Sequence, residues 1–264
     1  MLTQRPDEVQ LPAGVVAQKG DSTNPESLRK AYQGVDTLLV LNPVVPDELT
    51  RALIALRLAS DFDIKGIVYF SMVNVDLLPD VPHAAAKLAA ERLIVELDLP
   101  ATILRPNYFM QNDAMVKDAL LDGGVYAMPI GSVGASMVDI RDIAEVAALE
   151  ILKRERGPKR LPHDLIDISG PEVLTADVVA LIWTEVLGKK ISYAGDDLHA
   201  FERKTAEHGS AIMAFDVALM FEWWQKIGVS PMPNAEERLT AMLGRPLRTY
   251  RAFAQETALQ WQAV

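Results

Sequence analysis

Short apolar runs alternate with amphipathic stretches over the first part of the chain. The runs occupy residues 15–17, 37–41, 66–71 and 101–105, and polar residues, glycine or proline flank them. Continuous apolar runs of this length are typical of strands that are buried on both faces of a parallel sheet. We therefore predict four strands in this part of the chain.

The stretches between these runs repeat apolar residues at helical spacing. We predict helices over residues 49–60 and 84–97, and a shorter helix that begins at Asn24-Pro25 and ends before Gly34. Strands that alternate with helices in this way indicate repeated βαβ units. The first part of the chain is therefore expected to form a parallel sheet with right-handed crossovers.

The alternation becomes looser after residue 105. We predict a turn-rich segment over residues 123–138 and a helix over 142–152 with Asp142 as its N-cap. A strand over 166–169 and a helix over 175–187, capped by Thr175 and ended by Gly188, are expected to follow. We divide the chain into a core of residues 1–155 and a C-terminal lobe of residues 156–264, one strand of which is expected to join the main sheet.

The composition narrows the classes of function. The 264 residues are 50% hydrophobic and 23% charged, which is enough for a large core, and the net charge of −10 argues against nucleic acid as a partner. The chain has no cysteine, which excludes disulfides, thiolate zinc sites and cysteine nucleophiles. We expect a cytoplasmic protein that does not bind membranes, because neither a signal pattern nor a long apolar run is present.

Two further classes of site are not supported by the sequence. His163, His199 and His208 have no partners at the spacing of metal ligands, so we predict no metal site. The chain also lacks the Gly-x-Ser-x-Gly elbow of the α/β-hydrolases.

Short sequence motifs spread along the chain indicate its family more specifically than the composition does. They are LPAGV at residues 11–15, GD at 20–21, GVD at 34–36, VYFS at 68–71, HAAAK at 83–87, TILRPNYFM at 102–110, VDIRDIA at 138–144, ISGPE at 168–172, GRP at 244–246 and TYRAFA at 249–254. In this order and spacing they resemble the NmrA-like family of atypical short-chain dehydrogenases/reductases. The resemblance covers nearly the whole chain.

The resemblance implies an α/β fold: a Rossmann-type, doubly wound parallel sheet with a small, mainly helical C-terminal lobe. In such proteins a first strand, a Gly-x-x-Gly-x-x-Gly turn, a helix and a second strand come first. None of the 15 glycines forms that turn, and Gly131 and Gly134 come nearest to it. We expect the N-terminal βαβ unit to be truncated, with Leu2 at the exit of the second strand and open strand edges beside the gap. Either the sequence starts at an internal Met or the chain is a shortened member with altered or lost cofactor use, in which the binding of the dinucleotide is weakened or lost.

His83 and Lys87 are four residues apart and so share one face of a predicted helix. The resemblance places them at the Tyr-x-x-x-Lys pair of ordinary short-chain dehydrogenases, with His in place of Tyr. It implies that Lys87 holds the nicotinamide ribose and that His83 transfers a proton. The alternative is a solvated helix face on which Lys87 pairs with Glu91.

Other candidates lie at the ends of predicted strands, where ligands bind in open α/β sheets. Ser71 is a candidate catalytic and cofactor-binding residue, and its alternative role is to cap its own turn. The resemblance places Asn42 and Pro43 against the adenosine ribose and pyrophosphate. It places Asp21 beside the adenine, although Asp21 could equally form an Asx-turn into the next helix.

The loop after residue 105 resembles the family's loop near the nicotinamide. It makes Pro106 a cofactor-binding candidate and gives a predicted substrate pocket of Asn107, Tyr108, Phe109 and Asn112, although a packed Tyr-Phe pair would explain the same residues. Arg5 could bind a 2′-phosphate or be a surface charge. The aromatic residues at 221–224 are more typical of lobe core than of a cofactor site.

The resemblance implies an NAD(P)H-dependent reductase of a small carbonyl, quinone or similar electrophile, with NADP slightly favoured over NAD. The expected partner is a small-molecule substrate, and a homodimer is possible. One alternative is a regulatory protein that senses NAD(P) without turnover. Another is a cofactor-independent isomerase or cyclase with His83 as its base.

Overall fold

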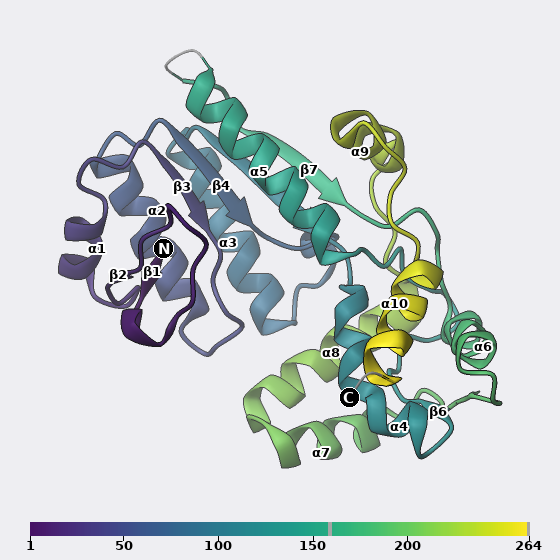
Figure 1. Cartoon of the computed structure of the whole chain (residues 1–264). Coiled ribbons are helices and arrows are strands. Elements are labelled where there is room, and N and C mark those ends of the chain that lie inside the picture. The colour runs from purple at the N-terminus through teal and green to yellow at the C-terminus, as the bar shows by residue number, and fades with distance from the viewer. Residues whose placement is uncertain (158–159, 263–264) are drawn as a thin grey trace.

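The computed structural model describes residues 1–157 and 160–262, and a four-stranded parallel sheet forms its centre (Figure 1). The strand order is β3 (Thr37–Val40), β4 (Gly66–Phe70), β5 (Ala101–Pro106) and β7 (Asp164–Ile168). Val68 of β4 pairs with Thr102 of β5, and Leu104 of β5 pairs with Ile166 of β7. The predicted parallel sheet is confirmed, and β7 joins it from beyond residue 155.

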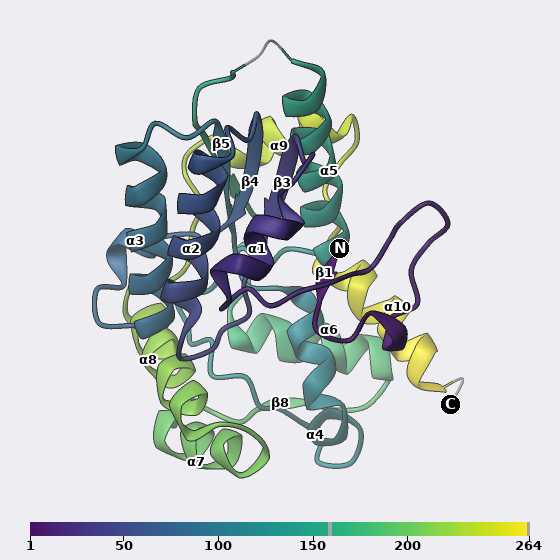
Figure 2. The ribbon, with the colours of Figure 1, turned by 90° about the vertical axis from the view of Figure 1, so that its left-hand side faces the viewer.

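Helices cover both faces of this sheet (Figure 2). On one face, α2 (Glu48–Asp61) and α3 (Pro82–Glu96) bury Leu56 and Ile94 against Ile67, and the short α1 (Pro25–Ala31) packs beside α2. On the other face, α5 (Ile140–Arg156) buries Val146 against the sheet. This is the doubly wound α/β arrangement of a Rossmann-type fold, as predicted.

Helix ends follow their capping residues. The side chain of Asn24 accepts hydrogen bonds from the backbone N–H groups of Glu26 and Ser27 at the start of α1. Thr175 caps α6 (Ala176–Leu187), which ends at Gly188 in the left-handed conformation. Both starts agree with the sequence signals.

The predicted N-cap at Asp142 is wrong. Helix α5 begins at Ile140, and Asp139 caps it by accepting a hydrogen bond from the Arg141 N–H. The Asp142 side chain is buried and is held by Arg245 and Arg248 from the C-terminal part of the chain. A carboxylate with two guanidinium partners is satisfied without capping a helix.

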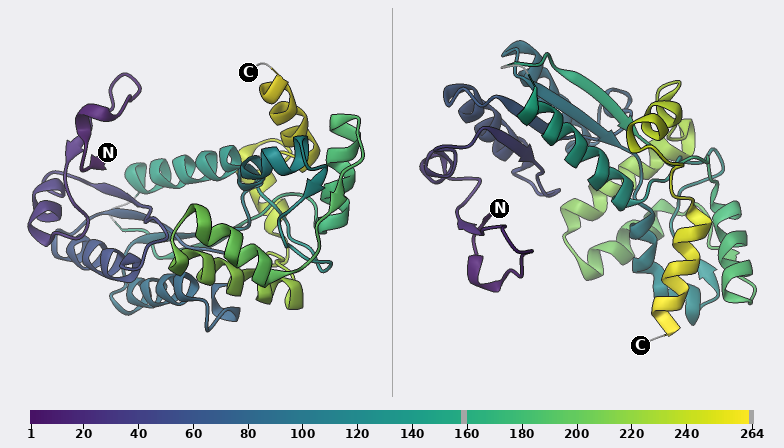
Figure 3. Two further views of the ribbon diagram at one scale, coloured as in Figure 1. Left: turned by 90° about the horizontal axis from the view of Figure 1, so that it is seen from below. Right: turned by 45° about the horizontal axis from the view of Figure 1, so that its top comes forward.

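The N-terminal segment forms a separate two-stranded parallel sheet of β1 (Leu2–Thr3) and β2 (Gln18–Lys19), joined through η1 (Pro6–Glu8). The strand predicted at residues 15–17 therefore lies at 18–19, and the Val16 side chain is 75% exposed. Among the described residues, β3 pairs only with β4. In the described ranges β3 is thus an edge strand, and Figure 3 shows the N-terminal segment projecting from the rest of the chain.

The lobe combines segments from both halves of the sequence (Figure 1). It contains η3 (Met110–Val116), α4 (Lys117–Leu121), α6, α7 (Leu198–His208), α8 (Ala211–Ile227), α10 (Tyr250–Gln262) and the paired strands β6 (Val125–Tyr126) and β8 (Ser192–Tyr193). Its core includes the fully buried Trp183, Phe221 and Tyr250, as predicted for the aromatic residues at 221–224. Helix α9 (Ala235–Leu243) packs instead against α5 and β7. The division at residue 155 stays a prediction.

Gly170 follows β7 where the chain passes close to a neighbouring backbone. A Cβ atom at Gly170 would lie 1.8 Å from the carbonyl oxygen of Met137, and the Gly170 N–H donates to the Ser136 carbonyl at 3.1 Å. We expect Gly170→Ala to lower the free energy of unfolding by about 3 kcal/mol, because backbone must move to admit the methyl group. Urea denaturation would measure this loss.

The matched control is Gly209→Ala, whose Cβ would meet nothing closer than 3.4 Å. Equal stabilities of the two variants would contradict the steric argument.

Candidate functional site

The candidate site lies at the carboxyl edge of the sheet, where α2 and α3 begin. Asn42 follows β3, and Ser71 follows β4. Glu48 stands in the first turn of α2, and its Oε1 atom lies 2.7 Å from the Lys87 Nζ atom of α3. The same Nζ atom lies 3.4 Å from the Phe70 carbonyl at the end of β4. Lys87 therefore joins α2, α3 and β4 at the edge where open α/β sheets bind ligands.

His83 and Lys87 are buried on α3. Their exposed fractions are 8% and 6%, so the alternative of a solvated helix face is wrong. The alternative pair of Lys87 with Glu91 is wrong as well, because Lys87 binds Glu48 and the Glu91 carboxylate binds the Arg105 guanidinium through two contacts. That bidentate pair fixes α3 to β5 one turn beyond Lys87.

The ring of His83 has a partner in the lobe. Its Nδ1 atom lies 2.8 Å from the Asp216 Oδ1 atom of α8, and Asp216 is itself buried. Sequence reasoning did not find Asp216, which lies 133 residues away along the chain. The available signal was a single acidic residue within the apolar run of residues 211–221.

Several buried polar atoms at the carboxyl edge have no hydrogen-bond partner among the described residues. They are Asn42 Nδ2, Glu48 Oε2, Ser71 Oγ and Ser169 Oγ. Buried polar atoms in native proteins nearly always have a partner. These atoms therefore fit a polar ligand at this edge. The prediction that Ser71 caps its own turn has no support, because its hydroxyl makes no such bond.

One more titratable group lies against this site. Burial raises the pKa of the Tyr69 hydroxyl, and the nearby carboxylates of Glu48 and Glu91 add to the shift. Tyr69 on β4 is therefore neutral at physiological pH and contributes no negative charge beside Lys87.

The predicted substrate-pocket residues have protein partners. Asn107 donates to the Val229 carbonyl at 2.9 Å, and the Tyr108 hydroxyl donates to Asp113 at 2.7 Å. The ring of Phe109 packs edge-on against Phe70, which precedes Ser71, with centroids 6.2 Å apart. Asn112 is half-buried. Phe109 thus contacts a residue of the candidate site, and the roles of all four toward a substrate stay predictions.

The remaining cofactor-binding candidates have mainly local contacts. The Arg5 guanidinium is exposed and pairs with Glu8 at 3.1 Å. Asp21 forms the Asx-turn named as its alternative, and the hydroxyl and N–H of Thr23 lower the pKa of the Asp21 carboxyl. Pro43 is exposed and Pro106 is buried at the end of β5. Their contacts with a nucleotide stay predictions.

Two cavities lie away from this edge. One of about 520 Å³ opens between α7 and α8, and another of about 390 Å³ lies at the amino edge of the sheet beside Lys65 and Leu99. Within residues 1–157 and 160–262, no group of three His, Asp or Glu residues could hold a metal ion. No helix in the same ranges has both the length and the apolar character needed to cross a bilayer.

The family profile described as the NmrA-like family matches residues 6–230. This chain belongs to the NmrA-like family. It is 27% identical over 252 residues to the NAD(P)H azoreductase of Xenophilus azovorans, an alignment that covers 95% of this chain and 85% of the azoreductase. The match confirms the resemblance to this family that the short sequence motifs indicated.

Solved structures of proteins with different roles show the same fold. The NADPH-dependent quinone oxidoreductase of Escherichia coli, solved with NADPH, superposes with a TM-score of 0.80 at 21% identity, covering 94% of this chain and 84% of the oxidoreductase. NmrA, a negative transcriptional regulator, superposes with a TM-score of 0.71 at 15% identity, covering 95% and 83% of the two chains. At identities of 21% and 15%, the likeness to these two structures establishes the fold of this chain but not its function.

Proposed function

We propose that this chain is an NAD(P)H-dependent oxidoreductase that reduces a small electrophile such as a carbonyl or quinone compound. The curated relative is a reductase that uses NAD(P)H, and a structural neighbour is a quinone reductase solved with NADPH. These two relatives favour NADPH or NADH as cofactor and a small molecule as substrate. A homodimer and a cytoplasmic location stay predictions.

The buried Lys87 is the observation that carries the proposal. Its ammonium lies 3.4 Å from the Phe70 carbonyl at the carboxyl end of β4, and His83 is one helical turn away on α3. Ser71, whose hydroxyl has no partner among the described residues, directly follows Phe70. An ammonium and a hydroxyl can bind the two hydroxyl groups of a ribose. The Asn42 amide, which follows the adjacent strand β3, offers a further donor with no partner among the described residues. These residues fit the ribose and nicotinamide part of a dinucleotide.

Each of these residues has a distinct role in the proposed reaction. A bound nicotinamide would supply the hydride. Lys87 would bind the ribose, and the Glu48 carboxylate would keep the ammonium at the sheet edge. His83 would give a proton to the substrate atom on which negative charge develops. Phe70 and Phe109 would limit the access of water to this edge.

Calorimetric titration with NADPH and NADH tests the proposal. We expect the wild-type chain to bind NADPH with a Kd in the micromolar range. Lys87→Met, made together with Glu48→Leu so that no buried carboxylate loses its partner, should weaken binding at least about tenfold. The matched control is Lys65→Met, which removes an exposed lysine at the opposite end of β4 and should leave the Kd unchanged.

A turnover assay with quinones and aldehydes would then distinguish the other functions. Binding of NADPH without oxidation of NADPH by any substrate would support a sensing protein. The absence of binding at millimolar cofactor would overturn the proposal and favour a cofactor-independent isomerase or cyclase.

A further inference from the structure

Asp216 is the single acidic residue in the apolar run of residues 211–221, which lies on α8. Asp216 is 5% exposed. Its Oδ1 atom lies 2.8 Å from the His83 Nδ1 atom and 3.4 Å from the His83 backbone nitrogen. One carboxylate oxygen therefore contacts both the ring and the backbone of His83.

We propose that Asp216 is the positioning residue of a His83–Asp216 dyad, which orients the imidazole for proton transfer to the substrate. The inference rests on the proposed function, because it assigns the proton of the reduction to His83. The contact with Nδ1 fixes which nitrogen does the chemistry. No bond to Nε2 occurs among the described residues, so Nε2 is the nitrogen available to a reacting atom.

The proton balance of the step follows from this geometry. In the proposed step the acid is the imidazolium, with protons on both nitrogens, and its Nδ1–H would donate to the Asp216 carboxylate 2.8 Å away. As the hydride adds to the substrate, negative charge develops on the substrate oxygen or nitrogen. The Nε2–H bond breaks, its electron pair stays on Nε2, and the proton forms a new O–H or N–H bond. The neutral ring keeps its proton on Nδ1, and water returns a proton to Nε2 after product release.

Asp216 can be changed without detaching α8 from its neighbours. The Trp223 Nε1–H donates to the Asp80 carboxylate at 2.5 Å, two turns further along α8. Phe221 and Trp224 on the same helix are buried in the lobe core. Asp216→Asn retains the size of the side chain and removes its charge. A loss of activity in this variant therefore reports on the dyad rather than on the position of the helix.

A double-mutant cycle on NADPH oxidation tests the dyad. We expect His83→Ala to lower kcat about 1000-fold and Asp216→Asn to lower it about 50-fold, with the Kd for NADPH and the KM unchanged. In the His83→Ala background, Asp216→Asn should have no further effect, because its role depends on the imidazole. Asp216→Glu should recover part of the rate, and Glu222→Gln on the exposed side of α8 should behave as wild type.

An equal loss from Asp216→Asn in both backgrounds would show a structural role and overturn the inference, as would an unchanged rate in the single variant. Nitrogen-15 NMR of the imidazoles gives a readout that needs no turnover, with the His83 signal identified among the 4 histidines by its loss in His83→Ala. An imidazolium or a neutral ring protonated on Nδ1 supports the dyad, whereas a neutral ring protonated on Nε2 alone overturns it. If no substrate is reduced, the proposed function has failed, and NMR still decides whether Asp216 fixes the tautomer.

Discussion

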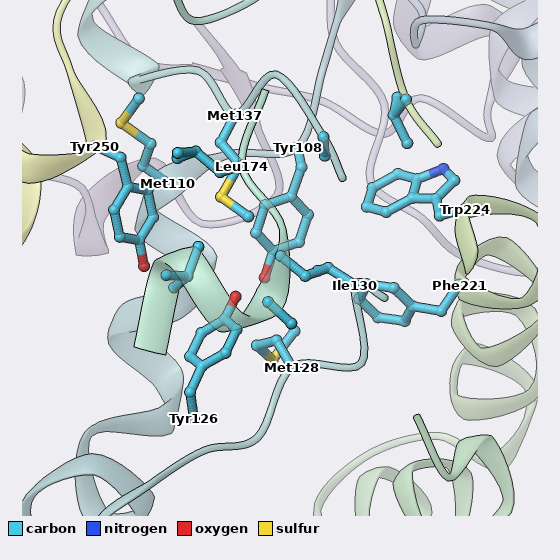
Figure 4. Packing of buried hydrophobic residues seen from close by; sticks show 14 of the residues in the cluster. Tyr108, Met110, Tyr126, Met128, Ile130, Met137, Leu174, Phe221, Trp224 and Tyr250 are labelled. Atoms are coloured by element: carbon cyan, nitrogen blue, oxygen red, sulfur yellow. The ribbon is translucent and has the colours of Figure 1, made fainter. Parts of the chain in front are cut away.

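Replacing Asp113 by leucine should lower the free energy of unfolding by about 4 kcal/mol at pH 5, because three buried phenol hydroxyls would lose their acceptor. Asp113 in η3 is fully buried. It accepts from Tyr108 at 2.7 Å, from Tyr126 at 2.9 Å and from Tyr250. Figure 4 shows these three tyrosines with their hydroxyls converging in the lobe core. The carboxyl group therefore ties η3 to β6, α10 and the loop after β5.

Equilibrium denaturation in urea would measure this loss. The matched control is Asp118→Leu, which removes an exposed aspartate from the next helix, α4, and should change the stability by less than about 0.5 kcal/mol. Similar stabilities of the two leucine variants would show that the tyrosine cluster does not depend on its carboxyl group.

The same carboxyl makes the stability depend on pH. Burial raises the pKa of Asp113 from 3.8 to about 6, although the three hydroxyls act in the opposite direction. Between pH 4 and 6 the folded protein therefore binds this proton more tightly than the unfolded chain does. The resulting stabilisation is complete below pH 4 and is lost as the pH rises through 6, with a total of about 3 kcal/mol.

Comparison with Asp113→Asn isolates this contribution from that of other carboxylates. The stability of the wild type minus that of the variant should fall between pH 4 and 7. A difference that stays constant over this range would contradict the assignment.

The sequence predicted the elements that depend on local patterns. The apolar runs at 37–41, 66–71 and 101–105 are strands of one sheet, because continuous apolar runs need burial on both faces. Caps such as Thr175 were also found, since a capping side chain bonds to the backbone within three residues. The strand predicted at 15–17 was wrong, because Val15 and Val16 are exposed although their apolar side chains give the same sequence pattern as a buried strand.

Partners in the candidate site could not be predicted in the same way. His83 and Lys87 were found through their spacing on one helix, but each binds an acid from another element. Asp216 and Glu48 are 133 and 39 residues away from them. No local pattern determines which acid reaches which base, since that depends on how α2 and α8 pack around α3. Glu91, the alternative partner of Lys87, binds Arg105 instead.

Lys87→Met should lower the free energy of unfolding by about 3 to 4 kcal/mol, because it leaves the Glu48 carboxylate buried without a counter-charge. Glu48 is 2% exposed, its Oε1 atom lies 2.7 Å from Lys87 Nζ, and its Oε2 atom has no partner among the described residues. Removing both charges avoids this cost. Lys87→Met combined with Glu48→Leu should therefore recover most of the lost stability, as measured by urea denaturation.

Lys65→Met is the matched control for this prediction. Lys65 pairs with Asp36 at 2.7 Å, but both side chains are more than half exposed, so its loss should cost less than about 1 kcal/mol. If the double variant were as unstable as Lys87→Met alone, the stem of Lys87 rather than its charge would hold α3 in place. If it is stable yet fails to bind NADPH, the ammonium of Lys87 serves the ligand, and Glu48 is the partner that keeps this buried charge in place at the sheet edge.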